Sequence, residues 1–244
     1  MQKALNIPTT DKKIIYGKLE IPKAKSKGLI IFIHGLTWDF DHHMYANGAK
    51  YFTGKWFTTY RFNLYGDQKQ ARKLKQASLK NHIQDVNTVS KYFQKKWIQN
   101  IFLIGHSFGG LTILYAKLKN ITWIILRDPS IGGKELLDDI TYHKQTNKYS
   151  IDRWDGVIYH IWSNMYKDFL IDSNEHLEKI KKITLPIQII CAEKWLQKAW
   201  KKYYKAAKLP KDFTIIPWAT HCFDEKWTEK QLFTETYKRV KKYS

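Results

Sequence analysis

The segment IGHSFGG, residues 104–110, is the most informative stretch of this sequence. It follows an apolar run and precedes residues with helical spacing. Gly105, Ser107 and Gly109 fit the pattern G-x-S-x-G, in which a serine lies on a sharp turn between a strand and a helix. The glycines allow the turn, and the start of the helix supplies unpaired N–H groups and a positive dipole end. The pattern therefore makes Ser107 a candidate nucleophile.

Short apolar runs alternate with helical patterns along most of the chain. The expected strands are 13–21, 29–33, 56–64, 101–105, 121–126, 185–192 and 213–218, and the expected helices are 43–54, 78–96, 108–119, 195–208 and 226–242. Ser78 is the expected N-cap of its helix. Strands that alternate with helices predict an α/β fold with a largely parallel sheet. Continuous apolar strands are typical of a sheet that is covered on both faces.

One long segment, residues 131–180, interrupts this alternation and is too long for a simple crossover. Its middle is rich in aromatic residues, with Tyr149, Trp154, Tyr159, Trp162, Tyr166 and Phe169. Asp155-Gly156 is a hairpin turn signal. We therefore predict a cap that contains a hairpin, inserted into a core formed by residues 1–130 and 181–244. Some aromatic rings should fill the cap, and others should line an apolar acyl site.

The composition indicates one domain with a substantial core, since 43% of the 244 residues are hydrophobic. The net charge is +20, but only five of the 42 basic residues are arginine, and the lysines are scattered. This distribution favours a solvated surface over a specific nucleic-acid site. Association through lysines alone would be weak and would fall steeply with salt. Peripheral contact with an anionic membrane stays open, and the sequence does not predict an oligomeric state.

The sequence predicts a cytoplasmic protein that needs no metal. No apolar run reaches about 18 residues, and the first residues lack the apolar core of a signal peptide. Cys191 and Cys222 match no metal-ligand spacing, so we expect two reduced, mostly buried thiols. The stretch DFDHH, residues 39–43, has no partner cluster elsewhere and is interpreted as a polar loop that leads into a helix.

A serine hydroxyl becomes a nucleophile only with a base, and the base needs an orienting acid. His221 follows the predicted strand 213–218 by a few residues. This places it at the carboxyl end of that strand, the same sheet edge as Ser107. His106 is the weaker candidate for the base, because its side chain should point in a different direction from that of Ser107.

Two backbone N–H groups are candidates for stabilising an oxyanion beside the serine. Phe108 begins the helix that follows the turn. Leu36 lies in FIHGLTW, residues 32–38, directly after Gly35 and the predicted strand 29–33. His34, in the same stretch, is interpreted as a residue that shapes the loop.

In these landmarks the chain resembles the α/β-hydrolase family, and most closely its small capped serine esterases and lipases. The matching pieces are HGL at 34–36, YRFNLYG at 60–66, GHSFGG at 105–110 and HCF at 221–223, in the family's order. The resemblance implies an eight-stranded, mostly parallel sheet flanked by helices. It also implies a serine–acid–histidine triad and acyl transfer through an acyl-enzyme, with no cofactor and no metal ion.

The acid of the triad departs from the family pattern. Most relatives carry an aspartate after the strand before last, but here the stretch reads AEKW, residues 192–195, and Trp195 occupies that position. Asp128, after the predicted strand 121–126, is the first alternative, because some members of the fold carry their acid there. Glu193 is the second, with a longer side chain that covers a shift of register. The third alternative is that no acid exists and activity is lost.

We favour Asp128, which keeps the order of serine, acid and histidine along the chain. The main hypothesis is a serine hydrolase of carboxylic esters with small or medium acyl chains, with Ser107, Asp128 and His221 as triad and the Leu36 and Phe108 N–H groups as oxyanion hole. A thioesterase or an amide hydrolase would use the same residues. A catalytically inactive binding protein that keeps the fold is the rival from another class.

Overall fold

The computed structural model describes residues 1–244 except 97, 131–139, 153–157, 196 and 244. Its largest element is an eight-stranded sheet in the order β1-β4-β6-β5-β7-β8-β12-β13. In that order the strands are β1 (Gln2–Ala4), β4 (Gly17–Glu20), β6 (Thr58–Phe62), β5 (Leu29–Ile33), β7 (Ile101–His106), β8 (Trp123–Arg127), β12 (Ile187–Ala192) and β13 (Lys211–Ile216). The pairs β1–β4 and β4–β6 are antiparallel, and all other pairs are parallel. The predicted fold class is confirmed.

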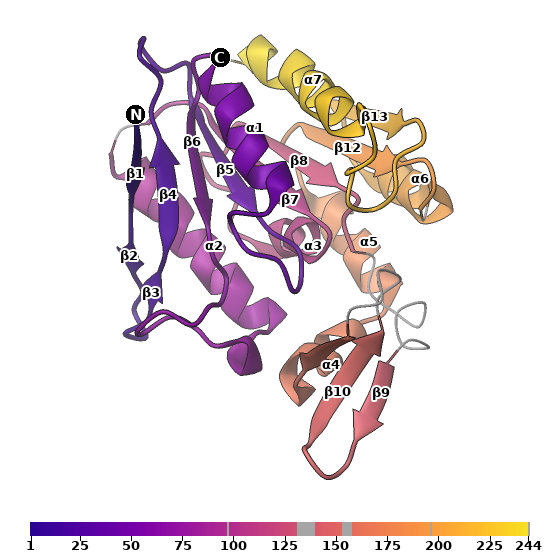
Figure 1. The fold of residues 1–244 in the computed structure, drawn as a ribbon. Helices are drawn as coiled ribbons and strands as arrows, with labels where there is room; N and C mark the ends of the chain where they lie inside the picture. Colours follow the sequence, from indigo (N-terminus) through magenta and orange to yellow (C-terminus); the bar gives the residue numbers. More distant parts are fainter. Residues whose placement is uncertain (97, 131–139, 153–157, 196, 244) are drawn as a thin grey trace.

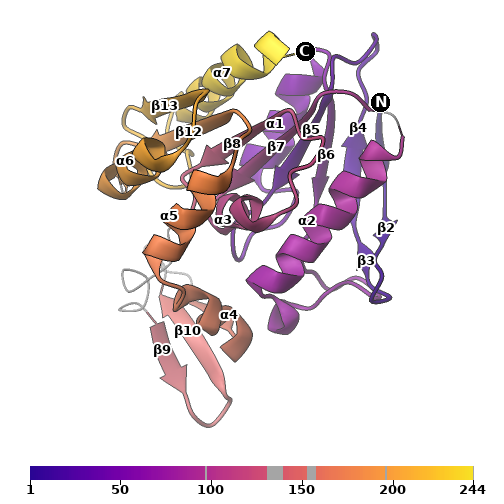
Figure 2. The ribbon, with the colours of Figure 1, turned by 180° about the vertical axis from the view of Figure 1, so that it is seen from behind.

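Helices cover both faces of this sheet (Figures 1 and 2). One face carries α1 (His43–Thr53) and α7 (Thr228–Val240), and the other carries α2 (Leu79–Gln94), α3 (Phe108–Tyr115) and α6 (Gln197–Ala206). Each face has its own apolar cluster. Phe32 and Ile104 pack with Phe52 of α1, whereas Leu103 packs with Val89 of α2. The central strands are therefore buried on both sides, as their continuous apolar runs predicted.

Most predicted elements are present, and their ends show where the sequence pattern was insufficient. The helix predicted at 78–96 begins after Ser78, whose Oγ accepts a hydrogen bond from the Asn81 N–H at 3.2 Å. The helix predicted at 108–119 ends earlier, at Tyr115. Beyond this end the Lys117 N–H donates to the Asn87 side chain, at 2.7 Å, instead of to a helix carbonyl.

The single strand predicted at 13–21 was wrong, because two strands occupy this run. β3 (Ile14–Ile15) pairs with β2 (Ile7–Pro8) in a small sheet of its own, and β4 joins the large sheet. β1 and β2 were not predicted. β1 is fully exposed along its length, so it has no alternation of apolar residues to reveal it.

A second, antiparallel sheet in the order β11-β10-β9 lies between β8 and β12 in the chain. Its strands are β9 (Ile140–His143), β10 (Lys148–Asp152) and β11 (Ile158–Ile161). With α4 (Ser163–Phe169) it projects beyond one end of the large sheet (Figure 1). The predicted turn at Asp155-Gly156 lies outside the described residues, as does Trp154. The domain boundaries at 130 and 181 stay predictions.

The projecting segment is attached to the core through α4 and α5 (Ser173–Lys182). The Asp168 carboxylate of α4 accepts a hydrogen bond from the Leu79 N–H, at the start of α2, at 2.6 Å. The Phe169 ring packs edge-on against Phe108, with centroids 5.8 Å apart. Tyr149 and Tyr166 instead stack on each other at 4.1 Å. Aromatic rings of this segment therefore both fill it and reach the residue after Ser107.

The sequence predicted two buried thiols and no membrane-spanning segment. Cys191 and Cys222 are both buried thiols, as predicted. Among the described residues, no helix has the length and apolar character that crossing a membrane requires.

Candidate active site

Ser107 lies on the turn between β7 and α3. Its backbone has φ 52° and ψ −123°, a left-handed conformation that is unfavourable for a residue with a side chain. Hydrogen bonds hold it there. The Ser107 N–H donates to the Arg127 carbonyl at 3.0 Å, and the Ser107 carbonyl accepts from the Ser130 N–H at 2.8 Å. The strand-to-helix turn that the pattern requires is thus present.

Glycines allow the backbone to pass close to this turn. A Cβ at Gly105 would lie 2.6 Å from the Gly109 carbonyl oxygen, which no real side chain tolerates. A Cβ at Gly35 would lie 3.0 Å from the Ser107 Cβ. The loop after β5 therefore lies directly against the serine, and glycine at 35 permits that approach.

Asp128 and His221 are brought together at the carboxyl ends of β8 and β13. The Asp128 Oδ2 atom lies 3.3 Å from the His221 Nδ1 atom, and the Asp128 Oδ1 atom accepts from the Ala192 N–H at 2.9 Å. Asp128 is completely buried. Burial raises the pKa of its carboxyl group, and the bonds to His221 and Ala192 oppose that rise. Asp128 follows Arg127, whose carbonyl holds Ser107.

Glu193, the other candidate acid, contacts the turn that follows β13. Its exposed side chain accepts a hydrogen bond from the Trp218 N–H at 2.8 Å and so fixes the turn after β13. Trp195, at the position where the family resemblance implies an acid, stacks on the His221 ring with centroids 4.9 Å apart. Of the two candidate acids, Asp128 is the one in hydrogen-bonding contact with the histidine.

His106 supports His221 from the end of β7. Its Nε2–H donates to the His221 carbonyl at 2.8 Å, and its ring stacks on Trp38 with centroids 4.5 Å apart. Burial holds the pKa of His106 well below its usual range, so this ring is neutral. Sequence reasoning missed this supporting contact, because it depends on a loop 115 residues away.

The loop that carries Leu36 is held by buried polar contacts. The His34 Nδ1–H donates to the Gly35 carbonyl at 2.7 Å, and His34 Nε2 accepts from the Leu64 N–H at 2.9 Å. Both ring nitrogens are thus occupied, which agrees with the interpretation of His34 as a loop-shaping residue. The Gly35 N–H donates to the Tyr45 hydroxyl at 3.2 Å.

The two predicted oxyanion donors flank the serine. Phe108 is the first residue of α3, and Leu36 follows Gly35, which contacts Ser107. Among the described residues, the Leu36 N–H has no hydrogen-bond acceptor. Both groups are therefore placed near the serine, and their role stays a prediction.

In the described part of the chain, no cluster of histidine, cysteine and carboxylate side chains forms a candidate metal site.

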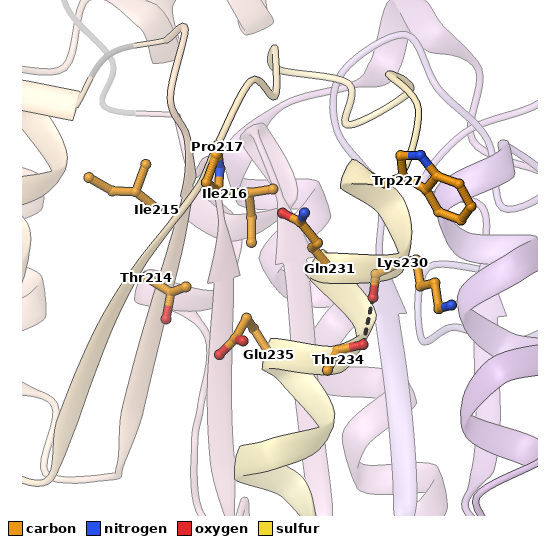
Figure 3. Close-up of a pocket in the computed structure, with 9 residues that line it drawn as sticks. All are labelled: Thr214, Ile215, Ile216, Pro217, Trp227, Lys230, Gln231, Thr234 and Glu235. Carbon is orange, nitrogen blue, oxygen red and sulfur yellow. Dashed lines mark hydrogen bonds between the residues drawn. The ribbon is translucent and has the colours of Figure 1, made fainter.

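A groove of about 360 Å³ lies between β13 and α7, apart from these residues (Figure 3). Its walls are the end of the edge strand and one side of the helix, and it is lined by Thr214, Ile215, Ile216, Pro217, Trp227, Lys230, Gln231, Thr234 and Glu235. It contains none of the predicted site residues.

Comparisons with known proteins agree with this fold. The family model described as "Serine aminopeptidase, S33" matches residues 24–140, just under half of the chain. Est1E from Butyrivibrio proteoclasticus, solved with ferulic acid bound, superposes with a TM-score of 0.82 at 21% identity, covering 98% of this chain and 99% of that one. The chain has the α/β-hydrolase fold.

Two further structures show how widely this α/β-hydrolase architecture is shared. The esterase domain of a Rhodothermus marinus protein has a TM-score of 0.76 at 12% identity, covering 100% and 99% of the two chains. A monoacylglycerol lipase from Paleococcus ferrophilus has a TM-score of 0.73 at 14% identity, covering 94% and 99%. No curated protein sequence matches the chain.

Buried histidines should make this protein less stable in mild acid. Burial lowers the pKa of His34 to about 4 and of His82 to about 3, and His106 is also shifted down. The unfolded chain takes up these protons near pH 6.5, so stability is lost as the pH falls from about 6.5 towards 4. His34 alone contributes about 3 kcal/mol over that range. Burial also raises the pKa of Asp85, to about 6, and the pKa values of Asp128 and Asp168, and these shifts oppose part of the loss.

Urea unfolding between pH 7 and pH 4.5 measures this effect. The midpoint should fall steadily with pH, and the exposed His160→Gln variant should show the same fall. A midpoint that stays constant or rises over this range would contradict the account.

Proposed function

We propose that this α/β-hydrolase is a serine hydrolase that cleaves carboxylic esters of small or medium acyl chains. The contact between Asp128 and His221, at the sheet edge that carries Ser107 on its left-handed turn, is the observation that supports it most. A nucleophile, a base and an orienting acid in one place are the requirements for acyl transfer. The esterase and lipase named among the similar structures favour an ester bond as the target.

In the first half-reaction, the Ser107 Oγ atom attacks the ester carbonyl carbon. His221 accepts the hydroxyl proton through Nε2, because its Nδ1 faces Asp128. The carboxylate of Asp128 orients the ring and stabilises its positive charge. The developing oxyanion accepts hydrogen bonds from the Leu36 and Phe108 N–H groups, and one such donor is typically worth about 10²–10³ in rate.

Collapse of the tetrahedral intermediate breaks the bond to the alcohol. His221 returns its proton to that leaving oxygen, and the acyl group stays on Ser107. In the second half-reaction, His221 takes a proton from water, and the resulting hydroxide attacks the acyl carbon. The proton then returns to the Ser107 oxygen as the carboxylic acid leaves, so the enzyme is restored and no cofactor is consumed.

An amide hydrolase is the second candidate, because the matched family model describes a serine aminopeptidase. The same residues would act, with an amine in place of the alcohol as leaving group. A thioester substrate would also be chemically compatible with them.

A panel of p-nitrophenyl esters, with matched thioesters and aminoacyl p-nitroanilides, tests the proposal. We expect the highest kcat/KM on esters with acyl chains of about two to eight carbons, because apolar ligand pockets are of limited volume. A preference for p-nitroanilides over every ester would replace the ester proposal with the aminopeptidase-like one. Background rates on all three classes would favour a binding protein.

A further inference from the structure

The His221 ring contacts two other rings besides the Asp128 carboxylate. The Trp195 ring lies 4.9 Å from it, centroid to centroid, with 27° between the planes. The His106 ring lies 4.5 Å away with 41° between the planes. Trp195 is half-buried and follows β12, at the position where the family resemblance implies an acid. The residue at that position therefore still contacts the histidine, but through an aromatic ring instead of a carboxylate.

The Asp128 contact alone constrains the imidazole weakly. Only one carboxylate oxygen reaches Nδ1, at 3.3 Å, slightly beyond the usual 2.7–3.2 Å range of N–H···O hydrogen bonds. The other oxygen is bound to the Ala192 N–H. A single long hydrogen bond leaves the ring free to tilt about the axis of that bond. A large ring that is nearly parallel to the imidazole restricts this tilt.

The face of a tryptophan ring also carries a negative quadrupole that attracts cations. His221 becomes an imidazolium when it accepts the Ser107 proton. Trp195 therefore interacts more strongly with the histidine in the transition state than in the resting enzyme. Only such a difference accelerates a chemical step.

The groups that face His221 fit this role for Trp195. Asp128, at the end of β8, is the carboxylate in contact with the ring. His106, at the end of β7, is neutral because burial lowers its pKa, so it does not repel an imidazolium. The His106 ring is itself stacked on Trp38 with 7° between the planes, and this stacking restricts its motion beside His221.

We propose that Trp195 is a positioning residue, whose ring face holds the His221 imidazole against Asp128 and stabilises its protonated form. The kinetic consequence rests on the proposed function, whereas the contact between the two rings does not.

Two substitutions separate the ring face from simple space filling. Trp195→Leu removes the aromatic face, and Trp195→Phe keeps a smaller one. Cation–π contacts correspond to about 2- to 30-fold in rate. We expect Trp195→Leu to lower kcat on p-nitrophenyl butyrate about tenfold, with KM changed less than about twofold. The acid limb of the kcat/KM profile should move to lower pH, and Trp195→Phe should restore most of both properties.

Trp218→Leu is the matched control. Trp218 is a tryptophan of the neighbouring loop, 71% exposed, with the Lys194 ammonium 5.6 Å from its ring centroid. This variant should keep the wild-type kcat and pH profile. Wild-type kcat and acid limb in Trp195→Leu would overturn the inference. A Trp195→Phe variant as impaired as Trp195→Leu would also overturn it, because the effect would then come from ring size alone.

A measurement without substrate separates this inference from the proposed function. The carbon-bound ring protons of His221 report its protonation by NMR, and Trp195→Leu should move their titration to lower pH. If the wild type hydrolyses no ester but this movement occurs, the proposed function fails and the stabilising contact stands. If esters are cleaved and the titration does not move, the contact does not stabilise the charged ring and the inference fails.

Discussion

Replacing Asp128 with asparagine should lower kcat for ester hydrolysis by about 10⁴-fold, with little change in KM. Asparagine has the same shape, and its amide oxygen can still accept the hydrogen bond from the Ala192 N–H. Its NH₂ group, however, cannot accept a hydrogen bond from the His221 Nδ1–H. The amide would favour the opposite tautomer and would not stabilise the imidazolium. Steady-state kinetics on p-nitrophenyl butyrate, together with circular dichroism, measures the effect in a folded protein.

Glu193→Gln is the control for this substitution. The Glu193 side chain is bonded to the Trp218 N–H, away from the histidine, and a glutamine oxygen can accept the same bond. We expect kcat within about threefold of wild type, because the change is on the surface. A large loss in Glu193→Gln with an active Asp128→Asn would reverse the assignment of the acid.

Ser107→Ala should have the largest effect on activity, with a loss of about 10⁶-fold in kcat. The variant removes the atom that forms the acyl-enzyme and leaves the backbone contacts of the turn in place. Alanine meets the same strain at φ 52° as serine, so the thermal unfolding temperature should change little. Ser130→Ala is the matched control, because its N–H still donates to the Ser107 carbonyl. It should keep near-wild-type activity.

Substantial activity in Ser107→Ala would contradict its role as nucleophile. Equal activity in the two serine variants, both near wild type, would show that hydrolysis takes place at another site.

The interior of the sheet was predictable because burial leaves a strong signal in the sequence. The run LIIFI matches β5 at its predicted bounds, since a strand with both faces covered has apolar residues at every position. The short strands near the N-terminus were not predictable in the same way. β1 is exposed and only three residues long, and the division of 13–21 into β3 and β4 depends on which strand pairs with each half.

The candidate site was partly accessible from local sequence. Ser107 is marked by its glycines, and His221 and Asp128 by their places after strands. The orientation of side chains was not accessible, because it depends on packing between distant segments. Trp195 illustrates this limit. In the sequence it only breaks the family pattern, whereas in the fold its ring lies against His221.

The cap illustrates a second limit. The aromatic residues of 131–180 predicted an insertion, but the sequence did not indicate that Asp168 would bond to the first residue of α2. The predicted hairpin corresponds to β10 and β11, which pair antiparallel before and after the predicted turn position. The third strand, β9, was not predicted, because it is mostly exposed and lacks apolar alternation.

The role of Ser107 as the nucleophile is tested by the intact mass of the protein after treatment with a fluorophosphonate, which reacts with activated serines. We expect one adduct, located on Ser107 by peptide mapping, with none in Ser107→Ala and much slower labelling in Asp128→Asn. A folded wild-type protein that forms no adduct, or that carries it on another residue, would contradict the assignment of Ser107 as the nucleophile.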